Sequence, residues 1–197
     1  MHRTDFINIE CEARALVSEE QYKAIFEYYS KVSNPKKYIT NINTYFDCED
    51  LYLTEHHIVL RARSISDKEY ELTLKIKGEN GDIEINHLLT LDEYEEFKKS
   101  IDIPSKDIKD KLIEYNVDLG RLKLITELKT DRLEVKYDDH LVVIDKNYYR
   151  GKIDFNVEIE ANDKKSALKY LNFHFKDFGV TYKKGYISKS RRAIYNL

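Results

Sequence analysis

Short segments in which apolar and polar residues alternate recur along the chain. In residues 7–14 the odd positions are apolar or small, and the even positions are polar or charged. An alternation with a period of two is typical of β-strands whose two faces differ chemically. The same pattern predicts strands at residues 60–63, 72–77, 82–86, 132–136 and 153–160. We expect two further strands at residues 39–47 and 141–145.

Helical patterns are fewer. Ser18 is a residue type that caps helices, and apolar residues at helical spacing follow it, which predicts a helix at residues 19–31. Similar patterns predict helices at residues 92–99, 105–115 and 163–178. Turn signals occur at residues 79–81, as a three-residue hairpin loop, and at Gly120 and Gly151. With neither a repeat nor a linker, residues 1–197 are expected to form a single α+β domain, an antiparallel sheet packed against a few helices.

The composition is typical of a protein with a folded core, and it excludes several other classes of protein. The 197 residues include 16 Tyr and 8 Phe but only 2 Pro and 6 Gly, which excludes a disordered chain. No apolar run approaches the roughly 18 residues that cross a bilayer, and the net charge of −3 gives no general attraction to nucleic acid. Cys11 and Cys48 lack the spacing of a metal cluster, and no secretory leader follows Met1. We therefore expect a cytoplasmic protein that binds neither membrane nor nucleic acid.

The polar faces of the predicted strands carry many charges. A charged strand face is ordinarily the solvated side of a half-buried sheet. If helices cover the apolar faces, however, a sheet that closes on itself turns its charged faces toward a shared interior. An ion-paired, solvated sheet and a charged lumen are both open interpretations at this point.

The charged residues divide into two chemical sets. Glu10 and Glu12, like Glu158 and Glu160, are two residues apart on predicted strands, so each pair places two carboxylates about 7 Å apart on one face. Oxygen donors of this kind favour Mg²⁺ or Mn²⁺ over Zn²⁺. The basic set suits phosphate, which Arg binds with two parallel hydrogen bonds; it comprises Arg14, Arg61, Arg63, Lys75, Lys77 and Arg132. A polyphosphate with its metal and ordinary cross-strand ion pairing both account for this pattern.

Several motifs also resemble those of a known family. Glu10-x-Glu12-x-Arg14 resembles the ExExK signature of the CYTH superfamily, the triphosphate tunnel metalloenzymes of adenylate cyclase and thiamine triphosphatase type. Later segments follow the order of that family's motifs: residues 44–47, 60–63 and 72–75, then Arg132, Asp145, Glu158-x-Glu160 and Lys189. The resemblance extends over essentially the whole chain and rests on this ordered set, because no single motif is specific. It implies a closed antiparallel eight-stranded β-barrel with a polar, charged lumen and helices packed outside.

The resemblance also implies roles for individual residues. The metal-binding residues, with Mg²⁺ or Mn²⁺ as cofactor, would be Glu10, Glu12, Asp145, Glu158 and Glu160. The substrate-binding residues would be Arg14, Arg61, Arg63, Lys75, Lys77, Glu84, Arg132 and Lys189. The catalytic residues would be Glu10, Glu12, Glu158, Lys75 and Tyr45, with Tyr45 positioning or activating the attacking water. Position 14 departs from the signature, because Arg in place of Lys keeps the charge but changes its shape.

These predictions favour metal-dependent hydrolysis of a small triphosphate, with inorganic tripolyphosphate first and thiamine triphosphate second. A cyclase that makes cyclic AMP from ATP is the main alternative, and it would need an adenine pocket at one tunnel mouth. A non-catalytic polyphosphate- or nucleotide-binding module and a structural protein with an ion-paired sheet are further alternatives. We expect Cys11 to be buried, the pair His56 and His57 to lie at an exposed turn, and the other histidines to be scattered.

Overall fold

The computed structural model describes residues 5–78 and 81–197, apart from the side chain of Glu10. Within this part of the chain, eight strands form one antiparallel sheet, and all eight lie at predicted positions. The predicted hairpin loop at residues 79–81 lies largely outside the described residues. The strands are β1 (Phe6–Val17), β2 (Lys36–Asp47), β3 (Ile58–Ile65), β4 (Glu69–Ile76), β5 (Asp82–Leu89), β6 (Lys123–Lys136), β7 (His140–Tyr149) and β8 (Lys152–Ala161).

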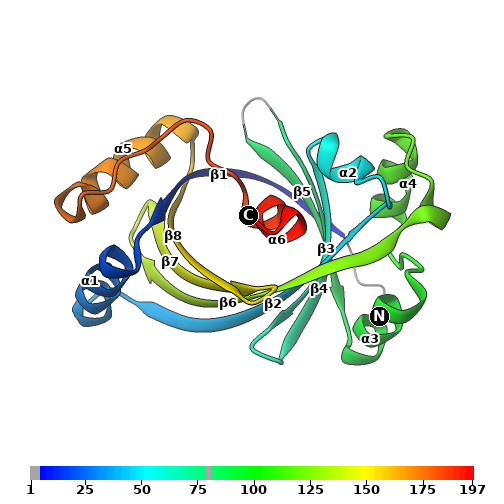
Figure 1. Cartoon of the computed structure of the whole chain (residues 1–197), viewed down its shortest axis with the longest axis horizontal. Helices are drawn as coiled ribbons and strands as arrows, with labels where there is room; N and C mark the ends of the chain where they lie inside the picture. Colours follow the sequence, from blue (N-terminus) through cyan, green and yellow to red (C-terminus); the bar gives the residue numbers. More distant parts are fainter. Residues whose placement is uncertain (1–4, 79–80) are drawn as a thin grey trace.

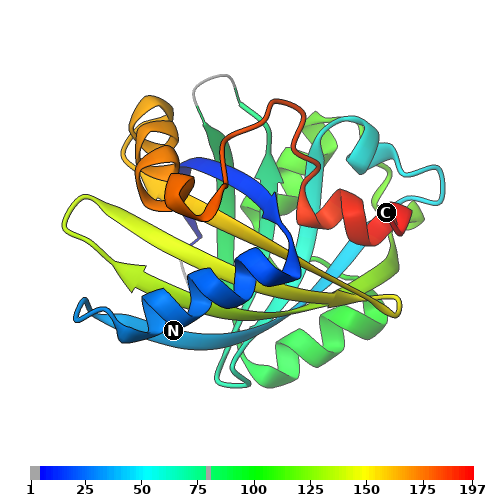
Figure 2. The same ribbon diagram turned by 60° about the vertical axis from the view of Figure 1, so that its left-hand side comes forward.

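Strand β1 connects two parts of the sheet. Residues 6–10 pair with β5, and residues 11–17 pair with β8. The remaining antiparallel pairs complete the order β1-β5-β4-β3-β2-β6-β7-β8, which returns to β1 in a closed ring of pairings. Figures 1 and 2 show the strongly curled sheet that results. The predicted α+β class and antiparallel sheet are confirmed, and alternate residues of each strand point to the inside and the outside of the curl.

Helices cover the outer face of the curled sheet in two groups (Figure 1). One group packs against β1, β6, β7 and β8, and its buried residues include Ile25 and Phe175. The other packs against β2 to β5, and its buried residues include Phe97 and Leu112. The apolar strand faces are thereby covered, as the alternation predicts. The first group comprises α1 (Glu19–Lys31) and α5 (Lys164–Phe175), and the second α2 (Tyr52–Glu55), α3 (Leu91–Ser100) and α4 (Lys106–Glu114).

The C-terminal helix α6 (Lys189–Tyr195) lies inside the curl, where Figure 1 shows it within the ring of strands. Its Ala193 and Ile194 pack against Tyr45, Leu128 and Tyr149. The sequence predicts neither α6 nor α2, because helices of seven and four residues are too short to show a periodic pattern. No helix in residues 5–78 and 81–197 is long and apolar enough to span a membrane.

Two further expectations are corrected by the structure. Strand β6 begins at Lys123, well before predicted residue 132, because its inward positions carry Thr126 and Thr130 and give little contrast with the polar outward positions. Cys11 is only half-buried, where burial was expected. Its neighbours on the outer face of β1, Ile7 and Ile9, are 63% and 67% exposed, so no helix of the described residues covers this end of the strand.

Two histidines that look scattered in the sequence meet between α1, α5 and the β6–β7 turn. His140 Nε2 lies 2.6 Å from His174 Nε2, His174 Nδ1 lies 2.9 Å from the Tyr29 hydroxyl, and His140 Nδ1 lies 2.7 Å from Asp139. One proton on each ring satisfies every contact: Tyr29 donates to His174, His174 donates to His140, and His140 donates to Asp139. This chain of hydrogen bonds ties both outer helices to the sheet.

The free energy of unfolding should therefore fall as the pH falls from about 6.5 to about 4. Burial and the neighbouring His140 lower the pKa of His174 from 6.5 to about 4. The unfolded chain takes up this proton at the higher pH and the folded chain only at the lower one, so protonation favours unfolding across the window. Calorimetry from pH 7 to pH 4.5 should show a smaller loss of Tm for His174→Gln than for the wild type. The exposed His56→Gln serves as control, and equal slopes for all three proteins would contradict the prediction.

Candidate functional site

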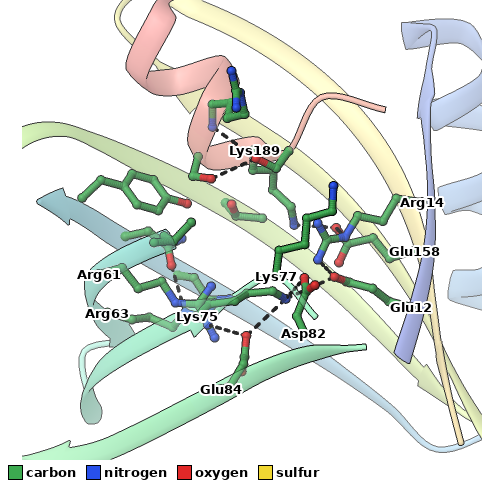
Figure 3. A pocket seen from close by; sticks show the side chains of 18 of the residues that line it. Glu12, Arg14, Arg61, Arg63, Lys75, Lys77, Asp82, Glu84, Glu158 and Lys189 are labelled. Atoms are coloured by element: carbon green, nitrogen blue, oxygen red, sulfur yellow. Dashed lines mark hydrogen bonds and ion pairs between the residues drawn. The ribbon is translucent and has the colours of Figure 1, made fainter. Parts of the chain in front are cut away.

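A cavity of about 750 Å³ opens inside the curled sheet, within the size range of small-molecule sites. Its lining residues come mainly from β1 to β6, β8, α2 and α6, and most of these residues are polar or charged (Figure 3). Most of these side chains occupy the inward positions of the strands. The alternation in the sequence therefore predicts which residues line the cavity. The predicted residues that line the cavity are Glu12, Arg14, Tyr45, Arg61, Arg63, Lys75, Lys77, Glu84, Arg132, Glu158, Glu160 and Lys189.

A first set of ion pairs surrounds Lys75. Its Nζ lies 3.2 Å from Glu12, 3.3 Å from Asp82 and 3.3 Å from Glu84, and Figure 3 shows these side chains pointing toward one another. Glu12 also contacts Arg14. Lys75 and Glu84 face each other in the register of β4 and β5, which accounts for their contact. Three carboxylates therefore surround the ammonium of Lys75, and Arg14 adds a second positive charge beside Glu12.

The two arginines of β3 differ in how firmly they are held. Arg63 Nη1 lies 3.2 Å from Glu71, and Arg63 Nε donates to Asn43 Oδ1 at 2.9 Å. Arg61 Nη2 lies 3.9 Å from Glu84, and Arg61 Nε is buried without a hydrogen-bond partner among the described residues. Burial, and then the charge of Arg61, lowers the pKa of Arg63. The guanidinium of Arg61 is therefore the more available of the two to an anion.

A buried set of ion pairs surrounds Asp145. Arg132 binds both oxygens of Asp145 at 2.8 and 2.9 Å and lies 3.2 Å from Glu158. Lys189, the first residue of α6, contacts Asp145 and lies 3.1 Å from Glu158. Asp145 is fully buried and is not among the residues that line the cavity. Its carboxylate, predicted as a metal ligand, holds two cavity-lining bases, Arg132 and Lys189, in place.

The charges of this buried set reinforce one another. Burial raises the pKa of Asp145, but the charges of Arg132 and Lys189 outweigh it and leave the pKa lowered. The pKa of Glu158 is lowered in the same way, with Lys189 and Arg14 as the main opposing charges. Although burial lowers it, the pKa of Arg132 is raised well above its usual value by Asp145 and Glu158. Both carboxylates and the guanidinium are accordingly ionised at neutral pH.

Three of the predicted metal ligands, Glu12, Glu158 and Glu160, lie where β1 pairs with β8. Glu12 is directly opposite Glu160 in the register, and Arg14 is opposite Glu158. Glu12 is also paired with Lys75 and Arg14, and carboxylate oxygens that face each other suit a hard divalent cation. The chemistry of these donors thus fits Mg²⁺ or Mn²⁺. Among residues 5–78 and 81–197 no three His, Cys, Asp or Glu side chains are grouped to hold an ion, and the side chain of Glu10 is not described.

Tyr45 is buried and Lys77 is exposed, although both line the cavity. Tyr45 is 4% exposed and faces Arg61 in the register of β2 and β3. Burial raises the pKa of Tyr45 despite four nearby arginines, so the phenol stays protonated at neutral pH. This favours a hydrogen-bond donor that positions a ligand over a base that activates water. Lys77 is exposed just beyond the end of β4 and lines the cavity.

Several cavity residues were not among the predicted site residues. Glu71 contacts Arg63, and extending the alternation of β4 two residues upstream of Thr73 would have found it. Tyr186 lies in the irregular segment before α6, with its ring centroid 6.0 Å from Arg14 Cζ, and irregular segments give no periodic signal. Asn41 and Asn43 face the cavity from β2, but a neutral amide on a strand does not suggest chemistry.

The fold and this set of charges define a family. Residues 8–177 match the model of the CYTH domain, so the chain belongs to the CYTH domain family, and the resemblance found in the sequence is confirmed. Among curated proteins, YjbK of Bacillus subtilis (strain 168), provisionally named as a triphosphatase, is 28% identical over 155 residues, or 79% of this chain and 78% of YjbK.

Solved structures show the same fold. A Bacillus halodurans protein provisionally named as an adenylate cyclase superposes with a TM-score of 0.84 at 25% identity, over 94% of this chain and 97% of its own. HpAC1 from Hippeastrum, described with a dominant triphosphatase activity, superposes with a TM-score of 0.78 at 17% identity, over 95% and 96% of the two chains. The second likeness is one of fold.

Proposed function

We propose that this protein is a metal-dependent triphosphatase whose closed ring of strands forms a tunnel for a small triphosphate. The observation that carries the proposal is the meeting of Arg14, Arg61, Lys75 and Lys189 with paired carboxylates in one cavity, although they come from four separate elements. A purely ion-paired sheet does not need an internal cavity of about 750 Å³. The triphosphatase name of YjbK supports the same activity.

The bases divide into two roles in this proposal. Phosphoryl transfer depends mainly on positioning the reactants and neutralising the phosphate charge. Arg61 and Lys77 would bind the phosphate oxygens directly, because Arg61 is loosely held and Lys77 is exposed at the cavity. Arg63, Arg132 and Lys189 would provide fixed positive charge, since carboxylates already orient them.

Glu10, Glu12, Glu158 and Glu160 would hold the Mg²⁺ or Mn²⁺ ion. When bound, such an ion neutralises phosphate oxygens and lowers the pKa of bound water. Glu158 would keep its charge for this role because Lys189 and Arg14 lower its pKa. The protonated phenol of Tyr45 would donate a hydrogen bond to the substrate or to the attacking water.

Incubation with tripolyphosphate, thiamine triphosphate and ATP tests the proposal, each with Mg²⁺, Mn²⁺ or a chelator. We expect phosphate release that requires metal and stops in chelator, and the ranking of the three rates would identify the substrate type. Pyrophosphate released together with cyclic AMP would instead assign the protein to the cyclases. If tripolyphosphate raised Tm without being hydrolysed, the cavity would bind phosphate without catalysis, and the proposal would be wrong.

A further inference from the structure

One asparagine inside the cavity differs from the others. Asn41, on β2, is 5% exposed and lines the cavity. Its Oδ1 is buried and accepts no hydrogen bond, and neither end of its amide is hydrogen-bonded within the described part of the chain. A buried amide left unpaired costs stability, so its retention needs a reason.

The buried inward-facing asparagines nearby are all paired. Asn43 accepts from Arg63, and Asn86 accepts from Thr73 while donating to Asn8. On β7, Asn147 donates to Asp154 and to Asn156. The unpaired amide of Asn41 is therefore a local exception and not a general property of the interior.

Asn41 lies next to the phosphate-binding part of the cavity. Along β2, the successive inward residues Tyr45, Asn43 and Asn41 face Arg61, Arg63 and Ile65 of β3. Asn41 is thus one two-residue step, about 7 Å, beyond the level of Arg63. Its other neighbour in the register, Thr130 of β6, already donates its hydroxyl to Asn147 at 2.8 Å. A group bound beside the phosphates at this level would meet the amide of Asn41.

We propose that Asn41 is a specificity-determining residue that binds the organic end of an organic triphosphate, an inference that rests on the proposed function. Ionised phosphate oxygens are acceptors, and they cannot satisfy the buried Oδ1, which needs an N–H or O–H donor. A side-chain amide can form two hydrogen bonds to a ring that has an amino group next to a ring nitrogen, as in adenine. The amide oxygen accepts from the amino group, and the amide NH₂ donates to the ring nitrogen. Adenine nucleotides and the aminopyrimidine of thiamine triphosphate both carry this edge, whereas tripolyphosphate does not.

The variant Asn41→Leu tests this inference. We expect kcat/KM to fall by about 5- to 150-fold for ATP or thiamine triphosphate, the range for one two-ended amide contact, and to change less than about twofold for tripolyphosphate. Tm without ligand should not fall, because the substitution removes an unpaired buried amide. Thr130→Val is the control, because Thr130 faces Asn41 in the register but its hydroxyl already donates to Asn147. We expect this variant to change kcat/KM for all three substrates by the same factor. Equal effects of Asn41→Leu on all three substrates would overturn the inference.

Binding measured by calorimetry in chelator separates this inference from the proposed function. If no substrate is hydrolysed, weaker binding of ATP or thiamine triphosphate to Asn41→Leu, with tripolyphosphate binding unchanged, would still support the role of Asn41. If the wild type hydrolyses tripolyphosphate but neither binds nor hydrolyses an organic triphosphate, the triphosphatase proposal stands and the inference about Asn41 is wrong. If the wild type binds none of the three in chelator and hydrolyses none of them with Mg²⁺ or Mn²⁺, both are wrong.

Discussion

Replacing Glu12 by Gln is expected to lower metal-dependent triphosphate hydrolysis on the order of 100-fold or more. Glu12 faces Glu160 across the β1–β8 ladder and lies 3.2 Å from Lys75. The substitution keeps the shape of the side chain but removes one of the charges that would hold the metal. The fold should be little affected, because Lys75 keeps its contacts with Asp82 and Glu84.

The measurement is the rate of phosphate release over a range of Mg²⁺ and Mn²⁺ concentrations, with Tm recorded for each protein. Glu114→Gln provides a matched control, since Glu114 is an exposed glutamate paired with Lys111 on α4, outside the cavity. We expect the control to keep the wild-type rate and both variants to keep a Tm close to that of the wild type. A wild-type rate for Glu12→Gln would show that the metal assignment is wrong.

Replacing Arg132 by Met should have the largest effect on stability, about 3–5 kcal/mol of lost unfolding free energy. Arg132 binds both oxygens of Asp145, which is fully buried, and also contacts Glu158. Without the guanidinium, Asp145 keeps only Lys189 as a basic partner among the described residues, and Glu158 keeps Lys189 and Arg14. The penalty comes from charge left without compensation, because Met fills a similar volume.

Urea unfolding of Arg132→Met at neutral and acidic pH checks this expectation. The pKa values of Asp145 and Glu158 are lowered in the folded protein, so their contribution is present above about pH 4.5 and is lost as the pH falls through the folded values. The difference from the wild type should therefore shrink in acid. Arg121→Met, which breaks the exposed pair with Asp50 at 2.7 Å, should cost far less. Equal losses for the two variants would contradict the argument.

The sequence predicts the strands and most of the cavity lining for a physical reason. Alternation records which side chains point inward, so Arg61, Arg63 and Lys75 could be assigned to one face before their partners were known. Which carboxylate meets which base depends on the register and on α6. Asp145, for example, turns out to be covered by Lys189 from a helix too short to predict.

Contacts between distant parts of the chain are a second feature that the sequence pattern does not predict. His140 and His174 lie on different elements and come together only when α5 packs against the sheet. Asn41 illustrates a third such feature, because its importance lies in a hydrogen bond that it does not make. No pattern of residue types shows whether a given amide will be paired.

The divided pairing of β1 has a consequence for how the protein folds. Strand β4 pairs with β3 and β5, which are its neighbours along the chain. Strand β1, in contrast, pairs with β8, which lies near the other end of the sequence. Joining such distant segments carries a larger loop-closure entropy, which slows folding. The same step brings Glu12 opposite Glu160, while Glu12 keeps its ion pairs with Lys75 and Arg14. The seam of the sheet and this part of the cavity lining therefore form in one event.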